Sequence, residues 1–533
     1  MNYIGNKGLS IYKTSLNERQ EKKIKKIKKD LVVKPFIPKG ASQFVYNQDN
    51  LKFTIYRESL TRYYLPRYYG LEEFGDNHTL KIPEGTYCAN MNFAGKLRDY
   101  QENICLKYIN HIKSNSEKMK FSYNYTGGGC LEIDTGMGKT VMAIYIMSLI
   151  KRKTIIVVHK EFLVNQWIER IQEFMPQVKI GRIQGKTIDV ENCHVVIAML
   201  QSLSMKSYDN TLFNEFGFMI IDEVHHMGAE VFSRALNKVV TNCTLGLSAT
   251  MERKDGLTKV FKLFLGPTIH VEKRDTSTNS VLIRTLHYEV DDDDYNETHK
   301  DYRGNVQFSK MISKLCDYNR RSDFILQYIE YFMNDDEKHN RNQQLMILGH
   351  NKSLLKYIHD GIIGRNIASQ SVGYYVGGMK ESDLKISETK KIVIATYSMA
   401  SEGLDIKTLT SLMMITPKTD IVQAVGRILR SKHKHCQPCV IDLIDSHDIF
   451  KRQYKQRQKF YNQQNYKIVS WNHKNESSKN SDGTYVFEHS KPQLWDTIYD
   501  YVDGKYSKIT KKGKKAVDEN SIDKALSVLI DDI

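Results

Sequence analysis

Eight short apolar runs constrain the fold of this chain more than any other feature. Longer stretches separate them, and several of these stretches have a helical pattern. Uninterrupted apolar runs of this length are typical of strands that are buried on both faces of a parallel sheet. The alternation of strand, loop and helix therefore predicts an α/β fold of two tandem, doubly wound parallel-sheet domains. The runs are TIIVVH, HVVIAML, FMIIDE and TLGLSAT between residues 154 and 250, and QLMILGH, KIVIAT, SLMMIT and CVIDLID between residues 344 and 445.

The chain has 533 residues, which is too long for a single hydrophobic core, so we expect several domains. The two α/β domains are predicted at residues 91–272 and 310–470. A polar interdomain connector that contains the run DDDD is expected between them, at residues 273–309. We also expect a small α+β region at residues 1–90 and a short C-terminal extension at residues 471–533, whose stretch SIDKALSVLI could form one docking helix.

The accessory region at residues 1–90 is strongly basic. Its stretch ERQEKKIKKIKKDLVVKP predicts an amphipathic helix with Ile24, Ile27 and Leu31 on one face, and Ser15 with Glu18 could form a capping box before it. The next stretch interleaves arginines with tyrosines, which suits contacts to phosphates and bases but equally suits a small core with a wet rim. Both interpretations stay open.

Charge and composition limit the partners and the compartment. The formal net charge of +16 indicates a polyanionic partner, most commonly nucleic acid. The longest apolar run, residues 141–150, is about half as long as a bilayer span, so no membrane partner is expected. The N-terminus has no apolar signal core, and the eight cysteines are scattered as reduced thiols would be, so we expect an intracellular, non-secreted protein.

The stretch HKHCQPC raises the possibility of a zinc site. His433, His435, Cys436 and Cys439 are suitable ligands, but a closed zinc site usually uses two separated ligand pairs. A second pair does not follow, so a turn that leads into a strand is favoured.

The stretch LEIDTGMGKT at residues 131–140 places a glycine-rich turn between an apolar run and a helical stretch. In such a turn, backbone N–H groups of Gly136 and Gly138 can surround an anion, and the helix N-terminus adds partial positive charge. Lys139 can reach the terminal phosphates of a nucleotide, and Thr140 can hold Mg²⁺. Together with Thr135, these residues predict a site for ATP and Mg²⁺.

Two carboxylates complete this predicted site. Asp222 and Glu223 follow the apolar run FMII, and we expect Asp222 to hold Mg²⁺ and Glu223 to polarise the water that attacks the γ-phosphate. Either feature alone would be weak evidence. Together, in one predicted sheet, they indicate the two ends of a P-loop ATPase site.

Further motifs follow in order along the chain. Ser248 and Thr250 end the run LGLSAT and can form hydrogen bonds towards the acidic loop and the neighbouring domain. In the second domain, QAVGRILR places Arg427 and Arg430 three residues apart on one helical face. Such arginines can act on a nucleotide held by the first domain, as an arginine finger supplied by the same chain.

With DEVH at 222–225, the series resembles a superfamily 2 helicase or translocase of the DExH type, over about residues 95–465. The runs SATMERKDG, YYVGGMK and CVIDLID resemble the XPB-like branch, and LPRYYG is most similar to members from large DNA viruses of the poxvirus transcript-release type; phage recombination helicases belong to the same branch. The resemblance implies two RecA-like domains. It also implies roles for further residues: Gln101 as the adenine contact, Gln423 in catalysis, Gly403 and Asp405 in nucleotide binding, His225 in coupling, and Lys160, Gln201, Ser202 and Thr396 in contacts to the nucleic-acid strand.

We therefore expect a monomeric, ATP-dependent motor that moves along nucleic acid, with DNA favoured over RNA and 3′ to 5′ as the direction. A role in viral-type transcription, recombination or repair, with transcription or replication machinery as a partner, follows from the resemblance. A viral protein of this kind would reside in the host cytoplasm, in a virus factory, or in the virion. The alternatives are an RNA helicase, a nucleic-acid-binding module that has lost hydrolysis and, ranked lower, the motor of a restriction enzyme.

Overall fold

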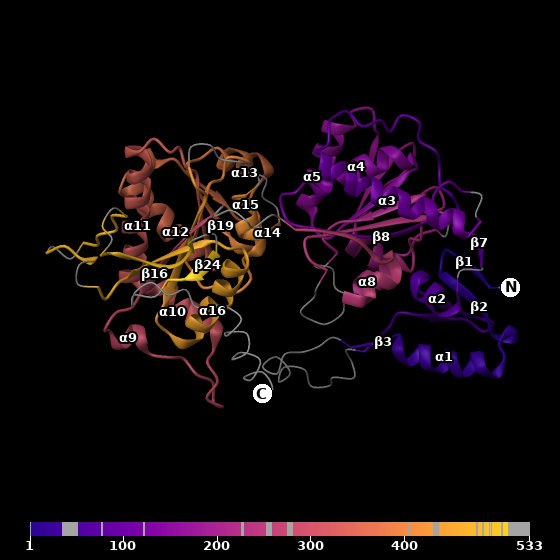
Figure 1. Cartoon of the computed structure of the whole chain (residues 1–533), viewed down its shortest axis with the longest axis horizontal. Coiled ribbons are helices and arrows are strands. Elements are labelled where there is room, and N and C mark those ends of the chain that lie inside the picture. The colour runs from indigo at the N-terminus through magenta and orange to yellow at the C-terminus, as the bar shows by residue number, and fades with distance from the viewer. Residues whose placement is uncertain are drawn as a thin grey trace. The chain divides into compact units, whose positions relative to one another are not determined.

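The computed structural model contains two compact units, residues 1–274 and residues 275–533 (Figure 1). Among the residues that it describes, no helix combines the length and the apolar character needed to cross a membrane. The described residues are 2–34, 52–75, 78–120, 123–209, 211–224, 229–251, 258–273, 281–402, 406–429, 436–475, 478–481, 484–489, 491, 493–502 and 505–509.

The first unit begins with a five-stranded sheet of order β5-β6-β2-β1-β7 and two helices. Their apolar side chains form one cluster with residues of α8, such as Val260, so this region packs directly on the first α/β domain. The elements are β1 (Tyr3–Gly5), β2 (Gly8–Tyr12), α1 (Glu18–Asp30), β5 (Arg57–Glu58), β6 (Arg62–Leu65), α2 (Arg67–Phe74) and β7 (Thr79–Leu80), with a separate pair β3 (Val32–Val33) and β4 (Phe53–Thr54).

Helix α1 has the predicted buried face, formed by Ile24, Ile27 and, directly after the helix, Leu31. The predicted cap is wrong, because Ser15 ends a short 3₁₀ turn instead. The helix is capped by Asn17, whose side chain accepts a hydrogen bond from the Gln20 amide at 2.9 Å, while Gln20 Oε1 accepts one from the Asn17 amide at 3.1 Å. A capping box is therefore present, but Asn and Gln form it.

The arginines that alternate with tyrosines have structural contacts. The Arg62 guanidinium lies 3.2 Å from the ring centroid of Tyr12 and donates to Ser10 Oγ at 2.9 Å. Arg67 is 4% exposed and donates to the Asn242 carbonyl at 2.7 Å and to Thr126 Oγ1 at 3.0 Å, in the first α/β domain. These contacts favour the small-core interpretation of this stretch.

The first α/β domain, which follows this region in the same unit, has an eight-stranded sheet of order β11-β10-β12-β9-β13-β14-β8-β15, in which only the β10–β11 pair is antiparallel among the described residues. Figure 1 shows α3 and α4 on one side of this sheet and α8 on the other. The strands are β8 (Gly127–Ile133), β9 (Thr154–Val158), β10 (Ile180–Gln184), β11 (Thr187–Asp189), β12 (Val195–Met199), β13 (Phe218–Ile221), β14 (Cys243–Ser248) and β15 (Thr268–Glu272). The helices are α3 (Asp99–Lys118), α4 (Lys139–Ile150), α5 (Glu161–Phe174), α6 (Leu200–Met205), α7 (Ala229–Leu236) and α8 (Thr258–Leu265).

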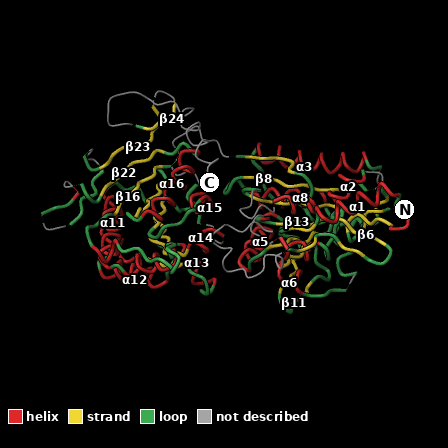
Figure 2. The backbone as a smooth tube through the Cα atoms, turned by 90° about the horizontal axis from the view of Figure 1, so that it is seen from below, coloured by secondary structure: helices red, strands yellow, loops and turns green. Residues whose placement is uncertain are grey.

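The second unit has a nine-stranded sheet of order β18-β19-β17-β20-β21-β16-β22-β23-β24, parallel as far as β22 (Figure 2). All eight apolar runs noted in the sequence form strands of the two sheets, as predicted. The strands are β16 (Leu282–Tyr288), β17 (Leu345–Gly349), β18 (Val372–Tyr375), β19 (Ile392–Thr396), β20 (Ser411–Met414), β21 (Cys439–Asp445), β22 (Lys467–Asn472), β23 (Trp495–Val502) and β24 (Lys505–Lys508). The helices are α9 (Asp293–Asn296), α10 (Phe308–Asp317), α11 (Asn319–Lys338), α12 (Lys352–Gly364), α13 (Glu381–Glu388), α14 (Tyr397–Glu402), α15 (Val422–Arg427) and α16 (Asp448–Gln463).

The segment 273–309 is more than the polar connector that we expected. Its residues Leu282–Tyr288 form β16, which pairs with β21 on one side and β22 on the other. Within the DDDD run, Asp292 caps α9 and accepts a hydrogen bond from the Tyr318 hydroxyl at 2.7 Å. In the C-terminal extension, β23 and β24 continue the sheet by antiparallel pairing, and the expected helix SIDKALSVLI lies outside the described residues.

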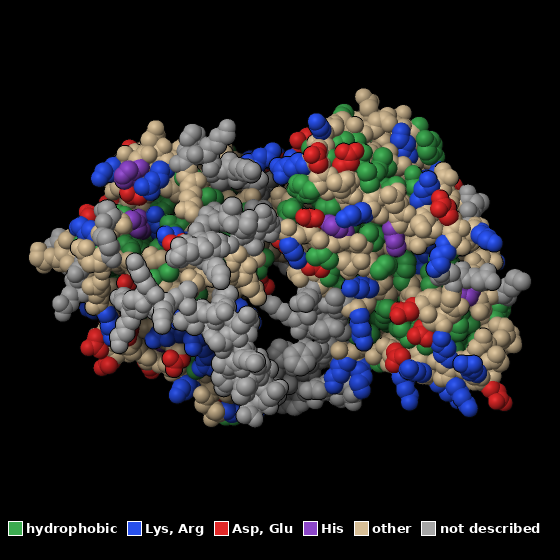
Figure 3. Space-filling model, in the orientation of Figure 1, with side chains coloured by type: hydrophobic (Ala, Val, Ile, Leu, Met, Phe, Trp, Pro, Cys, Tyr) green, Lys and Arg blue, Asp and Glu red, His purple; other side chains and the backbone are tan. Residues whose placement is uncertain are grey.

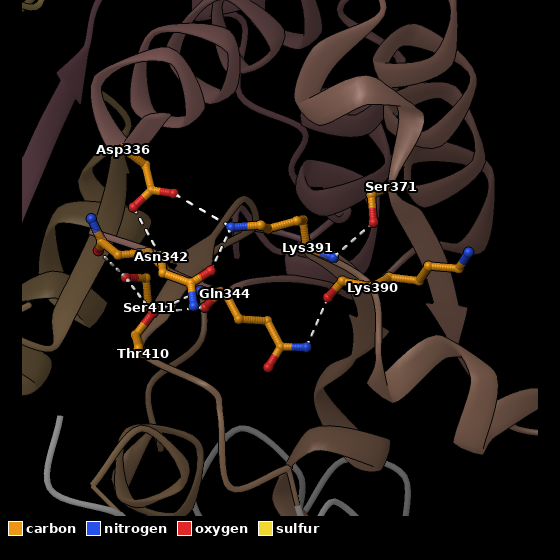
Figure 4. Close-up of polar contacts among 9 residues, drawn as sticks. Asp336, Asn342, Gln344, Ser371, Lys390, Lys391, Thr410 and Ser411 are labelled. Atoms are coloured by element: carbon orange, nitrogen blue, oxygen red, sulfur yellow. Dashed lines mark hydrogen bonds and ion pairs between the residues drawn. The ribbon is translucent and has the colours of Figure 1, made fainter. Parts of the chain in front are cut away.

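Polar side chains fix the amino ends of three strands of this sheet (Figure 4). The Gln344 amide donates to the Lys390 carbonyl at 2.8 Å, and the Gln344 backbone N–H donates to Thr410 Oγ1 at 2.9 Å. Lys391 Nζ donates to Asn342 Oδ1 at 2.8 Å. These bonds join the starts of β17, β19 and β20, so the register of the strands is set at the edge opposite their carboxyl ends.

Candidate ATP-binding and nucleic-acid-binding site

The predicted phosphate-binding turn connects β8 to α4. Gly136 and Gly138 have φ angles of 82° and 89°, in the left-handed region that favours glycine. A Cβ atom on Gly138 would lie 2.4 Å from Gln101 Nε2, so a side chain here would displace the amide group of Gln101. Lys139 and Thr140 form the first turn of α4, where backbone N–H groups lack helical partners and can bind an anion.

The start of α3 holds this turn from outside. Gln101 Nε2 and the Tyr100 hydroxyl both donate to the Met137 carbonyl, at 2.9 and 3.0 Å. Gln101 is 7% exposed, and its Oε1 accepts a hydrogen bond from the Arg98 amide at 3.0 Å. The predicted adenine contact is thus positioned beside the phosphate loop, and Tyr100 is a supporting residue that the sequence analysis missed. The only signal for it was its place next to Gln101.

Lys139 connects the phosphate-binding turn to the acidic loop that follows β13. Its Nζ lies 3.4 Å from Glu223 Oε1 and donates to the Ile133 carbonyl at 3.3 Å. The lysine side chain is 10% exposed and that of Glu223 23%. Glu223 has a φ of 49°, a left-handed conformation at the residue after the strand-terminal aspartate. The structure therefore brings the phosphate loop and the acidic loop together, as predicted from their places in one sheet.

Asp222 is held from two directions. Trp167 of α5 donates its indole N–H to Asp222 Oδ2 at 2.9 Å, and the Glu223 backbone N–H donates to Asp222 Oδ1 at 3.0 Å. Burial and the neighbouring charge of Glu223 raise the pKa of Asp222 to about 6, although Lys139 and Trp167 act in the opposite direction. Trp167 is 1% exposed, and its role at the carboxylate was not visible in the sequence.

The donor set fits a magnesium ion. Asp222 and Thr140 offer a carboxylate and a hydroxyl oxygen, and Mg²⁺ is usually bound through one or two protein oxygens, with water and substrate phosphates completing its coordination. A cation would also favour the ionised form of the buried Asp222. Across the described ranges there is no group of three or more His, Cys, Asp or Glu side chains that could hold a metal ion. His433 and His435 of the weighed zinc cluster lie outside the described residues.

Comparison with known proteins agrees with this site. Residues 94–253 match the family described as "Type III restriction enzyme, res subunit". Over 470 residues the chain is 35% identical to a protein of Acanthamoeba polyphaga mimivirus named "Putative ATP-dependent RNA helicase", and the match covers 86% of this chain and 85% of the relative. The chain belongs to the superfamily 2 helicases. This ATP-hydrolysing helicase also matches other viral helicases. The match to a helicase of Invertebrate iridescent virus 6 has 25% identity and covers 70% of this chain and 84% of the relative. The match to a helicase of African swine fever virus has 24% identity and covers 63% of this chain and 69% of the relative.

Predicted coupling residues of the helicase lie at the same sheet edge. Ser248 is fully buried at the end of β14, beside Glu132 of the strand that precedes the phosphate loop. Its hydroxyl donates to the Thr250 carbonyl, and the Thr250 amide donates back to Ser248 Oγ at 3.3 Å. His225 lies outside the described residues.

Three of the predicted strand-contacting residues of the helicase follow β9 and β12, whose carboxyl ends are adjacent. Gln201 Nε2 donates to the His159 carbonyl at 3.1 Å, and Ser202 Oγ accepts a hydrogen bond from the Gly185 amide at 3.0 Å. Lys160 precedes α5, and burial lowers its pKa. The structure thus brings these three residues to one edge.

In the second unit of the helicase, Thr396 ends β19, and its hydroxyl lies 3.3 Å from Ser398 Oγ. Arg427 ends α15, is 7% exposed and donates its Nε–H to the Ala400 carbonyl at 2.9 Å. Gln423 lies on the same helix and is half-buried. Gly403, Asp405 and Arg430 lie outside the described residues.

Proposed function

We propose that this helicase is a DNA translocase that moves 3′ to 5′, with Lys139 and Glu223 as the groups that bind and activate ATP. The observation that carries the ATP chemistry is the 3.4 Å distance between Lys139 Nζ and Glu223 Oε1. At this distance the positive charge of Lys139 and the negative charge of Glu223 offset each other. The terminal phosphates of ATP compete for the lysine, so that ATP binding releases Glu223 to accept a proton from the attacking water.

The remaining roles follow from position. Gly136 and Gly138 leave the backbone N–H groups of the turn open to phosphate oxygens, and Gln101 with Tyr100 keeps the turn in that shape. Thr140 and Asp222 would hold Mg²⁺, which when bound neutralises charge on the phosphates. Trp167 orients the Asp222 carboxylate. Arg427 and Arg430 are proposed to stabilise the charge that develops in the transition state.

The preference for DNA is supported by the motifs that resemble the XPB-like branch and by the net charge of +16. A second candidate, an RNA helicase, is favoured by the name of the mimivirus relative. The DNA translocase and the RNA helicase would differ in whether DNA or RNA stimulates ATP hydrolysis. By the same resemblance, we propose a role in viral-type transcription, recombination or repair.

The test is steady-state ATPase activity measured with single-stranded, duplex and forked DNA and with RNA of the same sequence. Lys139→Ala provides the background, because it removes the charge-assisted contact to the β- and γ-phosphates. We expect DNA to stimulate the wild-type rate more than RNA, and we expect the variant to show no stimulated hydrolysis. Stimulation by RNA alone would replace the DNA assignment with the RNA helicase.

A further inference from the structure

Helix α1 carries six lysines with two different environments. Lys23 and Lys28 are part of the accessory fold: Lys23 Nζ lies 2.9 Å from Glu73 Oε2, and Lys28 Nζ lies 2.5 Å from Glu58 Oε2. Both also lie over aromatic rings, at 5.1 Å from the Phe74 centroid for Lys23 and 4.9 Å from the Tyr63 centroid for Lys28. Their charges are therefore neutralised by this domain.

The other four lysines, Lys22, Lys25, Lys26 and Lys29, are exposed. Within the part of the chain that the structure describes, no hydrogen bond or ion pair holds any of them. They lie opposite the buried face of Ile24 and Ile27, in the arrangement that a period of 3.6 residues produces. Figure 3 shows Lys and Arg side chains gathered along the lower edge of the first unit, where Figure 1 places α1.

This outer face is fixed in place and carries an excess of positive charge, because its four lysines outnumber Glu18 and Glu21 of the first turn. Ile24, Ile27 and Leu31 pack in a core that includes Leu9 of β2 and Val260 of α8, so the helix cannot turn its lysines inward. Lysines three and four residues apart on a helix repel each other by a few tenths of a kcal/mol per pair, roughly 0.2–0.5. This repulsion does not stabilise the accessory region. A row of phosphates bound along the helix would offset the repulsion with attraction.

We propose that the outer face of α1, formed by Lys22, Lys25, Lys26 and Lys29, binds the phosphate backbone of duplex DNA beside the motor. The four lysines lie along about 10 Å of the helix axis. Duplex DNA carries one negative charge per about 1.7 Å of its axis, so several phosphates lie within reach of these lysines. This inference rests on the proposed function, because it concerns the same nucleic acid. It assigns the binding role of the accessory region to α1 and not to the stretch that contains Arg62 and Arg67, which have internal partners.

The test compares the full-length variant K22Q/K25Q/K26Q/K29Q with a control of equal charge, K310Q/K338Q/K356Q/K459Q. The control removes one exposed lysine from each of α10, α11, α12 and α16, so it changes net charge without removing a patch. Glutamine keeps the helix propensity close to that of lysine, and thermal unfolding checks that both variants fold. Duplex DNA binding is measured between about 50 and 200 mM salt, with a matched RNA as a second arm.

We expect the α1 variant to flatten the dependence of log affinity on log salt by about 3 to 4 units for duplex DNA, and the control by no more than about one. An unchanged slope in the α1 variant would overturn the inference while leaving the proposed function standing, provided that the wild type binds DNA. Equal losses in both variants would also overturn it, because net charge would then explain the effect. A loss confined to RNA would overturn the assignment to duplex DNA, and a wild type that binds no DNA would overturn both proposals.

Discussion

Lys139 Nζ lies 3.4 Å from Glu223 Oε1, so the lysine expected to bind phosphate and the carboxylate expected to activate water form an ion pair. The pair joins the end of the phosphate loop to the end of β13, two segments more than eighty residues apart in the chain. It keeps both side chains near the positions where the proposed chemistry requires them. Each charge also compensates the other where both side chains are partly removed from solvent.

Gly138→Ala should disable ATP binding. The new Cβ would meet Gln101 Nε2 at 2.4 Å and would also require a φ of 89° from a residue with a side chain. We expect the apparent KM for ATP to rise at least about tenfold, equivalent to about 1.4 kcal/mol. Gly304→Ala is the matched control, because Gly304 has a φ of 82° but nothing within 4 Å of the added atom. Equal ATPase kinetics in the two variants would contradict the assignment.

Trp167→Phe should weaken the response to magnesium while largely keeping the packing of α5. The substitution removes the indole N–H that donates to Asp222 Oδ2 at 2.9 Å, so the carboxylate loses one of the two donors that orient it. Loss of such a supporting group typically lowers metal affinity by about 10- to 100-fold. The Mg²⁺ concentration for half-maximal ATPase should therefore rise, with activity recovering at high Mg²⁺. An unchanged Mg²⁺ dependence would show that Trp167 is only a packing residue.

Arg427→Ala and Arg430→Ala should both lower kcat, but Arg427→Ala should also lower the free energy of unfolding. Arg427 donates to the Ala400 carbonyl, so its loss leaves a backbone acceptor unsatisfied and should cost about 1–3 kcal/mol of unfolding free energy. Both substitutions should lower kcat by orders of magnitude, about 10³-fold for a finger arginine, with a smaller effect on ATP binding. The measurements are denaturant unfolding and single-turnover hydrolysis. Normal kcat with weakened ATP affinity in Arg430→Ala would place that residue in ground-state binding.

The second unit should lose stability in mild acid through His473. This side chain is 5% exposed and bonds to the Tyr485 hydroxyl at 2.7 Å, and burial lowers its pKa to about 4, below the ordinary value near 6.5. The neutral form is therefore favoured by folding. Its contribution is complete above about pH 6.5 and is lost as the pH falls from there to about 4, by roughly 1.4 kcal/mol per pH unit and at most about 3 kcal/mol.

His473→Gln should flatten this part of the pH profile of the unfolding temperature, since the amide can still bond to Tyr485 but does not titrate in the range. His339→Gln, at an exposed residue after α11, is the control for replacing one histidine by glutamine. An identical acid response in wild type and His473→Gln would contradict the prediction.

The parts of the fold that were predicted correctly are those with a strong local signal. The eight apolar runs became strands because nearly every residue in each run is buried, and the glycines of the phosphate loop have positive φ angles that their residue type suggests. Strand β16 lies in the segment that we expected to be a connector, and Arg284 and His287 interrupt its apolar pattern. Arg284 is nevertheless 7% exposed, with its guanidinium 5.7 Å from the Phe332 ring. That contact depends on α11 and cannot be seen in the local sequence.

The candidate site shows the same division. Gly136, Gly138, Lys139, Asp222 and Glu223 lie in short motifs whose spacing indicates phosphate chemistry. Tyr100 and Trp167 belong to α3 and α5 and reach the site only through tertiary packing, and neither residue type signals such a role by itself. The exposed and the neutralised lysines of α1 also share the local sequence KKIKK, and they are distinguished by contacts to Glu58, Glu73 and neighbouring aromatic rings.

The most direct test of the account is Glu223→Gln in a single-turnover experiment. The substitution keeps the shape of the side chain and removes its ability to accept a proton, so ATP should bind with near wild-type affinity while hydrolysis slows by roughly 10²- to 10⁴-fold. ATP binding is measured with a fluorescent nucleotide analogue, and hydrolysis by quenched-flow phosphate release. Tight binding without turnover is the predicted result, and turnover at the wild-type rate would contradict the claim that Glu223 activates the attacking water.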